Sequence, residues 1–133
     1  MTENEIAKKV VNAAYELHNR MGPGLLETVY EVILAHEMRK AGLSVARQVS
    51  MPIKWDGLLF EEGFRADLIV GDKVIIELKS VEQLHPVHSK QLLTYLRVTD
   101  RKLGLLINFG ERLIKDGIKR VANGLDDSLP RLH

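Results

Sequence analysis

The sequence predicts a mixed α/β layer domain, with helices packed on a central β-sheet. Three observations lead to this fold class. Apolar residues recur at helical spacing near the start of the chain, strand-like apolar runs fill its middle, and a further helical pattern precedes one last apolar strand. The resulting order of helix, helix, strands, helix and strand is typical of proteins built in such layers.

Two amphipathic helices are predicted at the start of the chain. In the first, over residues 4–21, the apolar positions lie three or four residues apart: Ile6, Val10, Ala13, Ala14 and Leu17. Gly22-Pro23-Gly24 then breaks the helix. The second is expected over residues 25–41 and ends before Gly42, with an apolar side formed by Leu26, Val29, Tyr30, Ile33, Leu34 and Met38.

The middle of the chain predicts several extended segments. Residues 43–55 form the first, and Asp56-Gly57 supplies a hairpin turn to a short strand over residues 58–60. Two further strands are expected over residues 64–70 and 74–79, where valine, isoleucine and leucine are frequent.

The last third of the chain predicts one helix and one buried strand. Pro86 suits the first turn of a helix that runs to about Val98. Residues 103–109 form a nearly continuous apolar run, as in a central strand. Residues 111–121 leave two interpretations open, because their apolar spacing fits a helix whereas Asp116-Gly117 fits a hairpin turn.

Length and composition set further bounds. The 133 residues are interpreted as a single domain, residues 1–133, that is large enough to bury a core. The 19 basic and 18 acidic residues give a net charge of +1, so a nucleic acid would have to be bound by a local patch. The chain has no cysteine, no signal-peptide pattern and no apolar run near the roughly 20 residues of a membrane span, so we predict a cytoplasmic protein without a membrane partner. Residues from about Asn123 onward are expected to fray.

The most informative feature is a trio of charged side chains within two apolar strands. Asp67 lies in Phe64–Val70, whereas Glu77 and Lys79 lie in Val74–Lys79. An unpaired charge buried in such a strand would be expensive. The three charges therefore suggest a shared task at the rim of the sheet.

The spacing predicts the register in which these charges meet. Glu77 and Lys79 point to the same face of their strand, because side chains alternate. A turn over residues 71–73 places Asp67 opposite Glu77. A two-residue turn would instead pair Asp67 with Ile76, so the predicted site depends on the longer turn.

Two carboxylates and an ammonium group aimed at one point are what a phosphodiesterase dependent on Mg²⁺ or Mn²⁺ requires. In this interpretation Asp67, Glu77 and the main-chain carbonyl of Leu78 hold the metal, which polarises a phosphate and activates water. Lys79 then stabilises charge at the attacking water or the reacting phosphate. The alternative is a cross-strand ion pair at a sheet edge, with no chemical role.

Four further candidates lie on the predicted helices. Gln91 and Tyr95 are four residues apart and share a face, so Gln91 could hold a phosphate or a metal-bound water and Tyr95 could contact a phosphate or stack on a base. The alternative is a surface glutamine beside a half-buried tyrosine. Glu27 could add a carboxylate near the metal and His18 a further ligand, although the helix dipole alone explains each at its helix terminus.

Other charged residues carry weaker signals. His85 and His88 flank Pro86 and are interpreted as a helix-entry loop, because no partner ligands stand at zinc-site spacing. The last third of the chain is locally basic, which fits either a phosphate-binding surface or a solvated charged face.

Together these residues resemble the PD-(D/E)XK nuclease superfamily. Ala66-Asp67, nine intervening residues and Glu77-Leu78-Lys79 resemble its defining motif, with Ala66 in place of the signature proline. The segment Gln91-Leu92-Leu93-Thr94-Tyr95 resembles the Q-x-x-x-Y motif of the superfamily's exonuclease branch. Gly24-Leu25-Leu26-Glu27-Thr28-Val29-Tyr30 is similar to the signature of the GxxExxY family within that superfamily, and the likeness covers nearly the whole chain.

The resemblance implies a restriction-endonuclease-like core, which is a central mixed sheet of about four to five strands flanked by α-helices. It also implies roles for particular residues. Asp67 and Glu77 would be metal ligands, Lys79 the catalytic lysine and Glu27 the acid of the helix that precedes the sheet. His18 would match a metal-binding position, and the last two candidates would lie beside the site: Gln91 and Tyr95.

The implied function is a nuclease dependent on Mg²⁺ or Mn²⁺ that hydrolyses nucleic acid, with DNA favoured over RNA. A catalytically silent nucleic-acid-binding or assembly module on the same fold is the alternative, and a phosphoesterase for a small phosphorylated substrate is a weaker one. Because a small nuclease core often needs a second copy or a partner to complete its substrate groove, a homodimer or an unknown protein partner is a further hypothesis.

Overall fold

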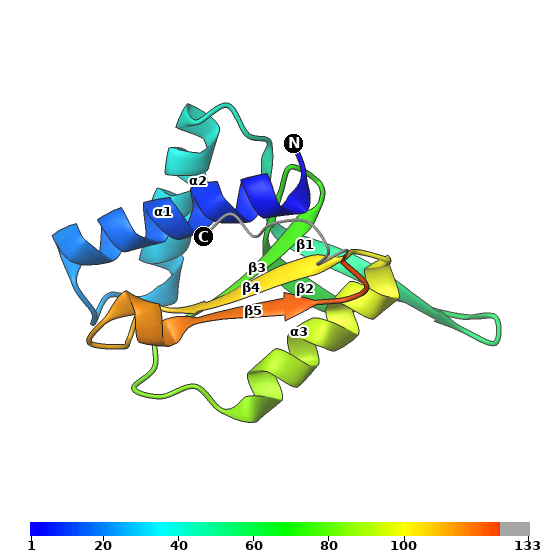
Figure 1. Ribbon diagram of the computed structural model, residues 1–133. Helices are drawn as coiled ribbons and strands as arrows, with labels where there is room; N and C mark the ends of the chain where they lie inside the picture. Colours follow the sequence, from blue (N-terminus) through cyan, green and yellow to red (C-terminus); the bar gives the residue numbers. More distant parts are fainter. Residues whose placement is uncertain (126–133) are drawn as a thin grey trace.

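The computed structural model describes residues 1–125 and shows three α-helices and five β-strands in this range (Figure 1). In chain order the elements are α1 (Glu3–Met21), α2 (Glu27–Lys40), β1 (Val45–Trp55), β2 (Leu58–Val70), β3 (Val74–Lys79), α3 (Pro86–Thr99), β4 (Leu103–Asn108), a 3₁₀ turn (Ile114–Gly117) and β5 (Ile118–Ala122). The predicted α/β class, with a mixed sheet flanked by helices, is confirmed. Within residues 1–125, no helix combines the length and the apolarity needed to cross a membrane.

The five strands form one mixed sheet in the order β1-β2-β3-β4-β5. The pair β3 and β4 is parallel, and the other three neighbouring pairs are antiparallel. Parallel neighbours need a crossover connection, which α3 supplies here. The centre of the sheet is the most apolar part, since all six residues of β4 are buried.

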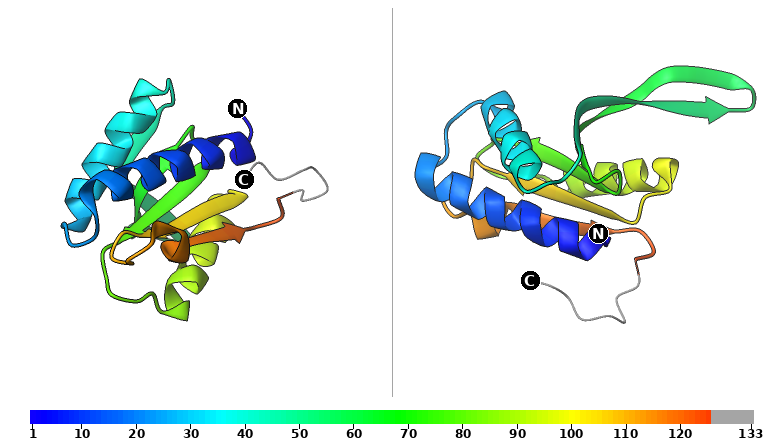
Figure 2. Two further views of the ribbon diagram at one scale, coloured as in Figure 1. Left: turned by 60° about the vertical axis from the view of Figure 1, so that its left-hand side comes forward. Right: turned by 90° about the horizontal axis from the view of Figure 1, so that it is seen from above.

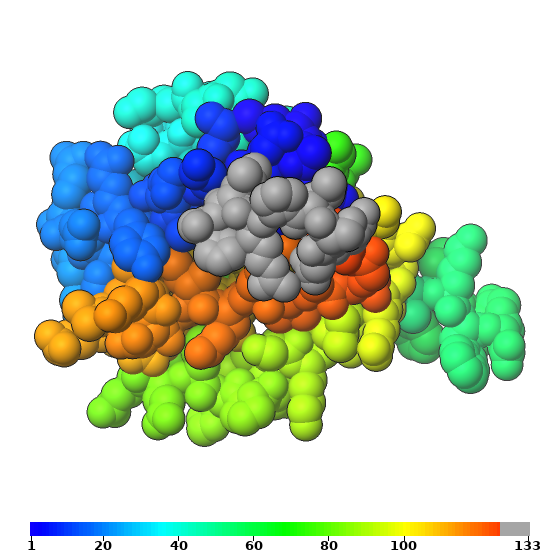
Figure 3. All heavy atoms as spheres, in the orientation of Figure 1, coloured from blue at the N-terminus to red at the C-terminus, as the bar shows by residue number. Residues whose placement is uncertain are grey.

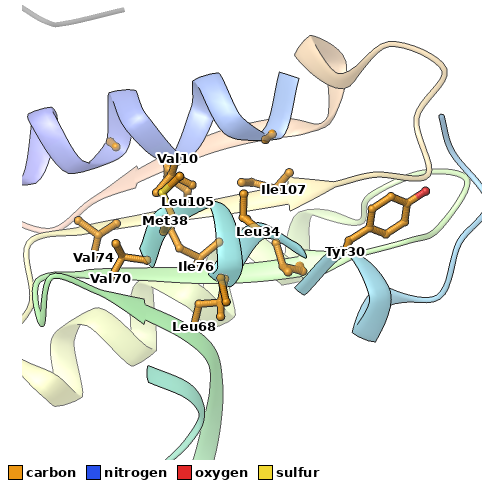
Figure 4. Packing of buried hydrophobic residues seen from close by; sticks show 14 of the residues in the cluster. Val10, Tyr30, Leu34, Met38, Leu68, Val70, Val74, Ile76, Leu105 and Ile107 are labelled. Carbon is orange, nitrogen blue, oxygen red and sulfur yellow. The ribbon is translucent and has the colours of Figure 1, made fainter. Parts of the chain in front are cut away.

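Helices cover both faces of the sheet, and two apolar clusters result (Figures 1 and 2). On one face, α1 and α2 pack on inward side chains of the strands. Figure 4 shows Val10, Leu34 and Met38 of these helices against a row of strand residues: Leu68, Val70, Val74, Ile76, Leu105 and Ile107. On the other face, α3 packs on the sheet through Leu92 and Leu96. Alternate residues of each strand therefore serve different clusters.

Local sequence signals explain where the helices end. The hydroxyl of Thr2 accepts a 3.2 Å bond from the main-chain N–H of Glu5, which caps α1. Gly22 follows α1 with φ 70°, a left-handed conformation that suits glycine. Pro86 occupies the first turn of α3, as predicted, because it has no N–H to leave unsatisfied there.

The hairpin between β1 and β2 differs from the prediction. The turn at Asp56-Gly57 is confirmed, with φ of 47° and 80° at its two residues. The predicted strands 58–60 and 64–70, however, form the single strand β2. Its register with β1 shifts between Met51 and Ile53. The residues between Phe60 and Phe64, where the sequence suggests a break, are therefore accommodated as an irregularity within one strand pair.

The chain after β4 resolves the two interpretations of residues 111–121. No helix of that length forms; the 3₁₀ turn leads instead into β5, which returns antiparallel to β4 with Ile107 opposite Ile118. Asn123, where fraying was predicted to begin, is held by two bonds. Its main-chain N–H donates to the carbonyl of Lys102 at 2.8 Å, and its side-chain amide donates to the carbonyl of Arg101 at 2.9 Å. Residues 126–133, on which the rest of that prediction falls, lie outside the described part of the chain.

Candidate active site

Asp67 of β2 and Glu77 of β3 meet as the spacing predicts. The turn covers residues 71–73, and Val70 pairs with Val74 and Leu68 with Ile76. The next position of this register brings Asp67 to Glu77, and the main-chain N–H of Asp67 donates to Oε1 of Glu77 at 3.3 Å. The longer turn is therefore the one observed.

Asp67 is also tied to the residue that follows Glu77. Its Oδ2 accepts a 2.8 Å bond from the main-chain N–H of Leu78, which fixes the orientation of the carboxylate relative to β3. Because β3 is a buried central strand, these contacts hold both acids on a rigid part of the fold. Asp67, Glu77 and the backbone of Leu78 thus form one compact polar group at the sheet.

Electrostatics at this group are strongly perturbed. The pKa of Glu77 is raised to about 8, mainly because burial penalises the charged carboxylate and also because Asp67 lies beside it. The charge of Lys79 opposes this rise in part. At neutral pH the pair therefore retains a proton that a bound cation would displace, which is the behaviour of carboxylates assembled around a metal site.

Lys79 lies on the same face of β3 as Glu77, two residues further along the strand. Its positive charge acts to lower the pKa of Glu77 and also that of His88, which lies in the first turn of α3. The pKa of His88 is lowered by burial, by Lys79 and by His85. The entry of α3 therefore lies within electrostatic reach of the polar group, a relationship that the sequence analysis did not predict for His88.

Tyr95 of α3 faces the same region. Its ring stacks on Phe64 of β2 with centroids 3.9 Å apart and planes 6° from parallel. Burial raises the pKa of Tyr95, and the charges of Glu77 and Asp67 raise it further. Gln91 is exposed one helical turn earlier, on the side of α3 that its four-residue spacing from Tyr95 predicts.

Glu27 and His18 are placed differently. Glu27 is the first residue of α2 and is exposed. His18 is buried near the end of α1, where its Nε2 lies 2.8 Å from the carbonyl oxygen of Glu111 and its ring lies against Phe109. Neither residue forms, with Asp67 and Glu77, a group of three potential metal ligands. Their proposed part in metal binding stays a prediction.

Three polar residues outside the predicted set form a network that ends at Asp67. Glu31 of α2 is only 4% exposed, and its carboxylate accepts from Arg47 at 3.0 Å and from the amide of Gln48 at 2.6 Å. Gln48 also lies 3.4 Å from Oδ1 of Asp67. One signal in the sequence could have identified Glu31, because it shares the buried helical face of Leu34, Ala35 and Met38, where an acid is unusual.

The donor set fits a hard divalent cation. In the described part of the chain, no three histidine or acidic side chains gather closely enough to hold a metal by themselves. Mg²⁺, however, keeps several waters and is commonly bound by one or two carboxylates together with substrate phosphates. Asp67, Glu77 and the carbonyl of Leu78 match that requirement in number and in oxygen chemistry.

Comparison with known protein families identifies the class to which this chain belongs. The family model of the PD-(D/E)XK nuclease superfamily matches residues 4–121, and the chain belongs to that superfamily. The sheet flanked by helices is accordingly restriction-endonuclease-like.

A solved structure shows a similar fold. The crystal structure of SSO0001 superposes with a TM-score of 0.53 over 94% of this chain and 68% of that one, at 17% sequence identity. At this level of identity the likeness concerns the fold alone. No curated protein sequence matches the chain significantly.

Proposed function

We propose that this protein is a nuclease that depends on Mg²⁺ or Mn²⁺ and hydrolyses phosphodiester bonds of nucleic acid, with DNA preferred over RNA. One observation carries the proposal. Two carboxylates from neighbouring strands converge, Asp67 and Glu77, and burial together with the charge of Asp67 raises the pKa of Glu77 to about 8, with Lys79 on the same face. Membership of the PD-(D/E)XK nuclease superfamily supports the same conclusion.

In this proposal each residue of the polar group has its own task. Asp67, Glu77 and the main-chain carbonyl of Leu78 hold the metal. When bound, the ion supplies a water of lowered pKa and neutralises charge on the phosphate. The ammonium group of Lys79 stabilises the negative charge that develops at the attacking water and the phosphorus.

The residues of α3 would bind and orient the substrate. Gln91 is exposed and can reach a phosphate or a metal-bound water, and Tyr95 lies close enough to Glu77 and Asp67 for their charges to raise its pKa. The stack with Phe64 restricts the ring of Tyr95 and reduces the entropy lost on binding. We further propose Glu27 and His18 as additional residues on the metal side of the site, as the resemblance to the superfamily implies.

Two finer assignments complete the proposal. We propose that the chain belongs to the GxxExxY family of the superfamily, because the segment Gly24–Tyr30 resembles the signature of that family. The absence of cysteine fits the reducing cytoplasm, where we expect the protein to act.

A cleavage assay on labelled single- and double-stranded DNA and RNA tests the function. We expect cutting with Mg²⁺ or Mn²⁺, none with EDTA, and a loss of at least about 100-fold in Lys79→Ala. Lys102→Ala is the matched control, since Lys102 is exposed and precedes β4 at the opposite end of the sheet from Lys79. Metal-independent cutting, or equal rates for Lys79→Ala and wild type, would show that this site is not the catalytic centre.

The alternative is a catalytically silent module that binds nucleic acid or a protein. The net charge of +1 supplies no global attraction to nucleic acid, so such a module would bind through a local basic patch or through a protein partner. In that case affinity for nucleic acid persists in EDTA and survives Lys79→Ala, while no substrate is cut.

A further inference from the structure

A groove of about 730 Å³ lies on the face of the sheet opposite the candidate active site. It opens between α1 and the segment that runs from the 3₁₀ turn into β5, which Figures 1 and 3 show in blue and in orange on the same side of the molecule. Leu105 of β4 lines the groove and belongs to the apolar cluster under α1 and α2. Its neighbour Leu106, which pairs with Glu77, belongs instead to the cluster under α3. Because paired residues share a face and neighbours along a strand alternate, Glu77 and Lys79 point away from the groove.

One side of α1 forms a wall of the groove. Its lining residues recur at helical spacing and therefore share one face: Asn4, Ala7, Lys8, Val11, Asn12 and Tyr15. The rest of the lining comes from the sheet and the 3₁₀ turn: Leu105, Lys115, Ile118 and Arg120. Apolar side chains and a small number of polar ones thus surround a volume within the roughly 300–1,000 Å³ of typical small-molecule sites.

The charges that line the groove are all positive. Three of its ten described lining residues are basic, Lys8, Lys115 and Arg120, and none of the ten is acidic. Lys8 and Lys115 are exposed, and neither forms an ion pair or a hydrogen bond within residues 1–125. Since the whole chain has a net charge of only +1, this concentration of cations is local and favours an anionic ligand.

Three uncharged polar side chains of α1 add groups of defined geometry. Oδ1 of Asn4 is buried and accepts no hydrogen bond within residues 1–125, which is costly unless a donor reaches it. Asn12 supplies a second amide to the lining. Tyr15 is 40% exposed, and its ring contacts no other aromatic ring in the described part of the chain. A free aromatic face and amide groups suit a planar ring with donors and acceptors on its edge, as in a nucleobase.

We propose that this groove binds a nucleoside phosphate, with the phosphate at Lys8 and Lys115 and the base against Tyr15. The two ammonium groups form charge-assisted bonds with phosphate oxygens. The ring of Tyr15 stacks on the base, and the amides of Asn4 and Asn12 bond to its edge. The size of the groove favours one nucleotide over a polymer, because a specific complex with DNA covers roughly 1,000–2,500 Å² of protein surface.

Amide chemical shifts of the full chain, titrated with AMP, test the proposal. EDTA is present throughout, so that no metal ion holds the phosphate at the candidate active site. We expect shifts that saturate at or below about 1 mM AMP at the amides of Val11, Leu105 and Ile118. The amides of Glu77 and Lys79, on the opposite face of the sheet, should stay unchanged.

Two fragments of AMP separate the two halves of the site. Ribose 5-phosphate has the phosphate without the base, and adenosine has the base without the phosphate. Each should bind at least about tenfold more weakly than AMP, because each loses one set of contacts. Added salt should weaken the binding of AMP and leave that of adenosine unchanged.

Substitutions assign the contacts to residues. Lys8→Gln and Lys115→Gln should each lower the affinity for AMP by about tenfold, because each removes a charge-assisted bond. Tyr15→Leu should weaken the binding of AMP and spare that of ribose 5-phosphate. The matched control is Lys119→Gln, since Lys119 is exposed on β5 but pairs with Leu106 on the other face of the sheet. This variant should bind AMP as wild type does.

Three outcomes would overturn the proposal. One is the absence of shifts at about 10 mM AMP, and another is a set of shifts confined to the candidate active site. The third is equal affinity for AMP and for inorganic phosphate, which would show an anion site without a place for a base. All these measurements are made in EDTA and none requires cleavage, so their result is independent of the proposed function.

Discussion

The side-chain amide of Gln48 on β1 donates a 2.6 Å bond to Oε1 of the buried Glu31 on α2. The same nitrogen lies 3.4 Å from Oδ1 of Asp67. Gln48 has φ 50°, a left-handed conformation that costs a non-glycine residue about 1–2 kcal/mol. Gln48 keeps this strained conformation while it bridges α2 to a candidate metal ligand. We infer that Gln48 positions Asp67.

Substitutions at Gln48 should separate the strain from the hydrogen bonds. Gln48→Ala loses both side-chain bonds and keeps the strained backbone, whereas Gln48→Gly loses the bonds but relieves the strain. We expect Gln48→Gly to be more stable than Gln48→Ala by about 1 kcal/mol, the reverse of their usual order within a strand. Urea denaturation measures the difference, and an alanine variant that is the more stable of the two would contradict the assignment.

Glu31 should contribute more to stability than an exposed acid on the same helix. Glu31→Gln removes the charge that pairs with Arg47 at 2.9 Å in a site where Glu31 is almost fully buried, and we expect a loss of about 1–3 kcal/mol. The control is Glu37→Gln, whose pair with Lys40 is largely solvated and worth at most about 0.5 kcal/mol. Equal losses in thermal or urea unfolding would show that the network has no structural role.

The raised pKa of Glu77 predicts how the stability of the metal-free protein varies with pH. The carboxyl titrates near 4.5 when unfolded and near 8 when folded, so between these values only the native state keeps the proton. The contribution of Glu77 to the free energy of unfolding therefore falls as the pH rises from about 4.5 to about 8. In EDTA, Glu77→Gln should lose this dependence and gain stability relative to wild type at pH 8. A variant that follows the wild-type profile would rule out Glu77 as its source.

The same proton should compete with a metal ion. Because binding requires an ionised Glu77, the apparent affinity for Mn²⁺ should rise by up to about tenfold per pH unit below pH 8 and then level off. Calorimetric titration of the wild-type protein between pH 6 and 9 measures this slope. Glu77→Gln should bind Mn²⁺ weakly throughout this pH range, with little dependence on pH. A flat profile for the wild type would mean that Glu77 is not a ligand.

Much of the fold could be predicted because the three helices and the pair of strands β2 and β3 each follow a strong local pattern. The helices α1, α2 and α3 have clear breaks in Gly22-Pro23-Gly24, Gly42 and Pro86, so their observed ends lie within a few residues of the predicted ones. The register of β2 and β3 followed from the alternation of side chains and the length of one turn. The charges in those strands were informative because apolar strands seldom contain them.

The remaining features depend on contacts between residues far apart in the sequence. The segment Glu61-Glu62-Gly63 resembles a break in polarity and composition, yet cross-strand bonds with β1 carry β2 through it. No local pattern predicts that Gln48 adopts a left-handed φ or reaches both Glu31 and Asp67. His88 likewise approaches Lys79 only through the crossover that brings the start of α3 to the end of β3.

A comparison of cleavage rates in Mn²⁺ tests the central claim most directly. The purified wild-type protein and Asp67→Asn are each assayed on the nucleic acid that the wild type prefers. Asp72→Asn is the control, because Asp72 lies exposed in the turn between the same strands and pairs only with Arg101 among the described ion pairs. We predict a loss of at least about 100-fold in Asp67→Asn with the fold retained, and a wild-type rate in Asp72→Asn. A folded Asp67→Asn protein that cuts as fast as wild type would contradict the assignment of Asp67 and Glu77 as the catalytic metal site.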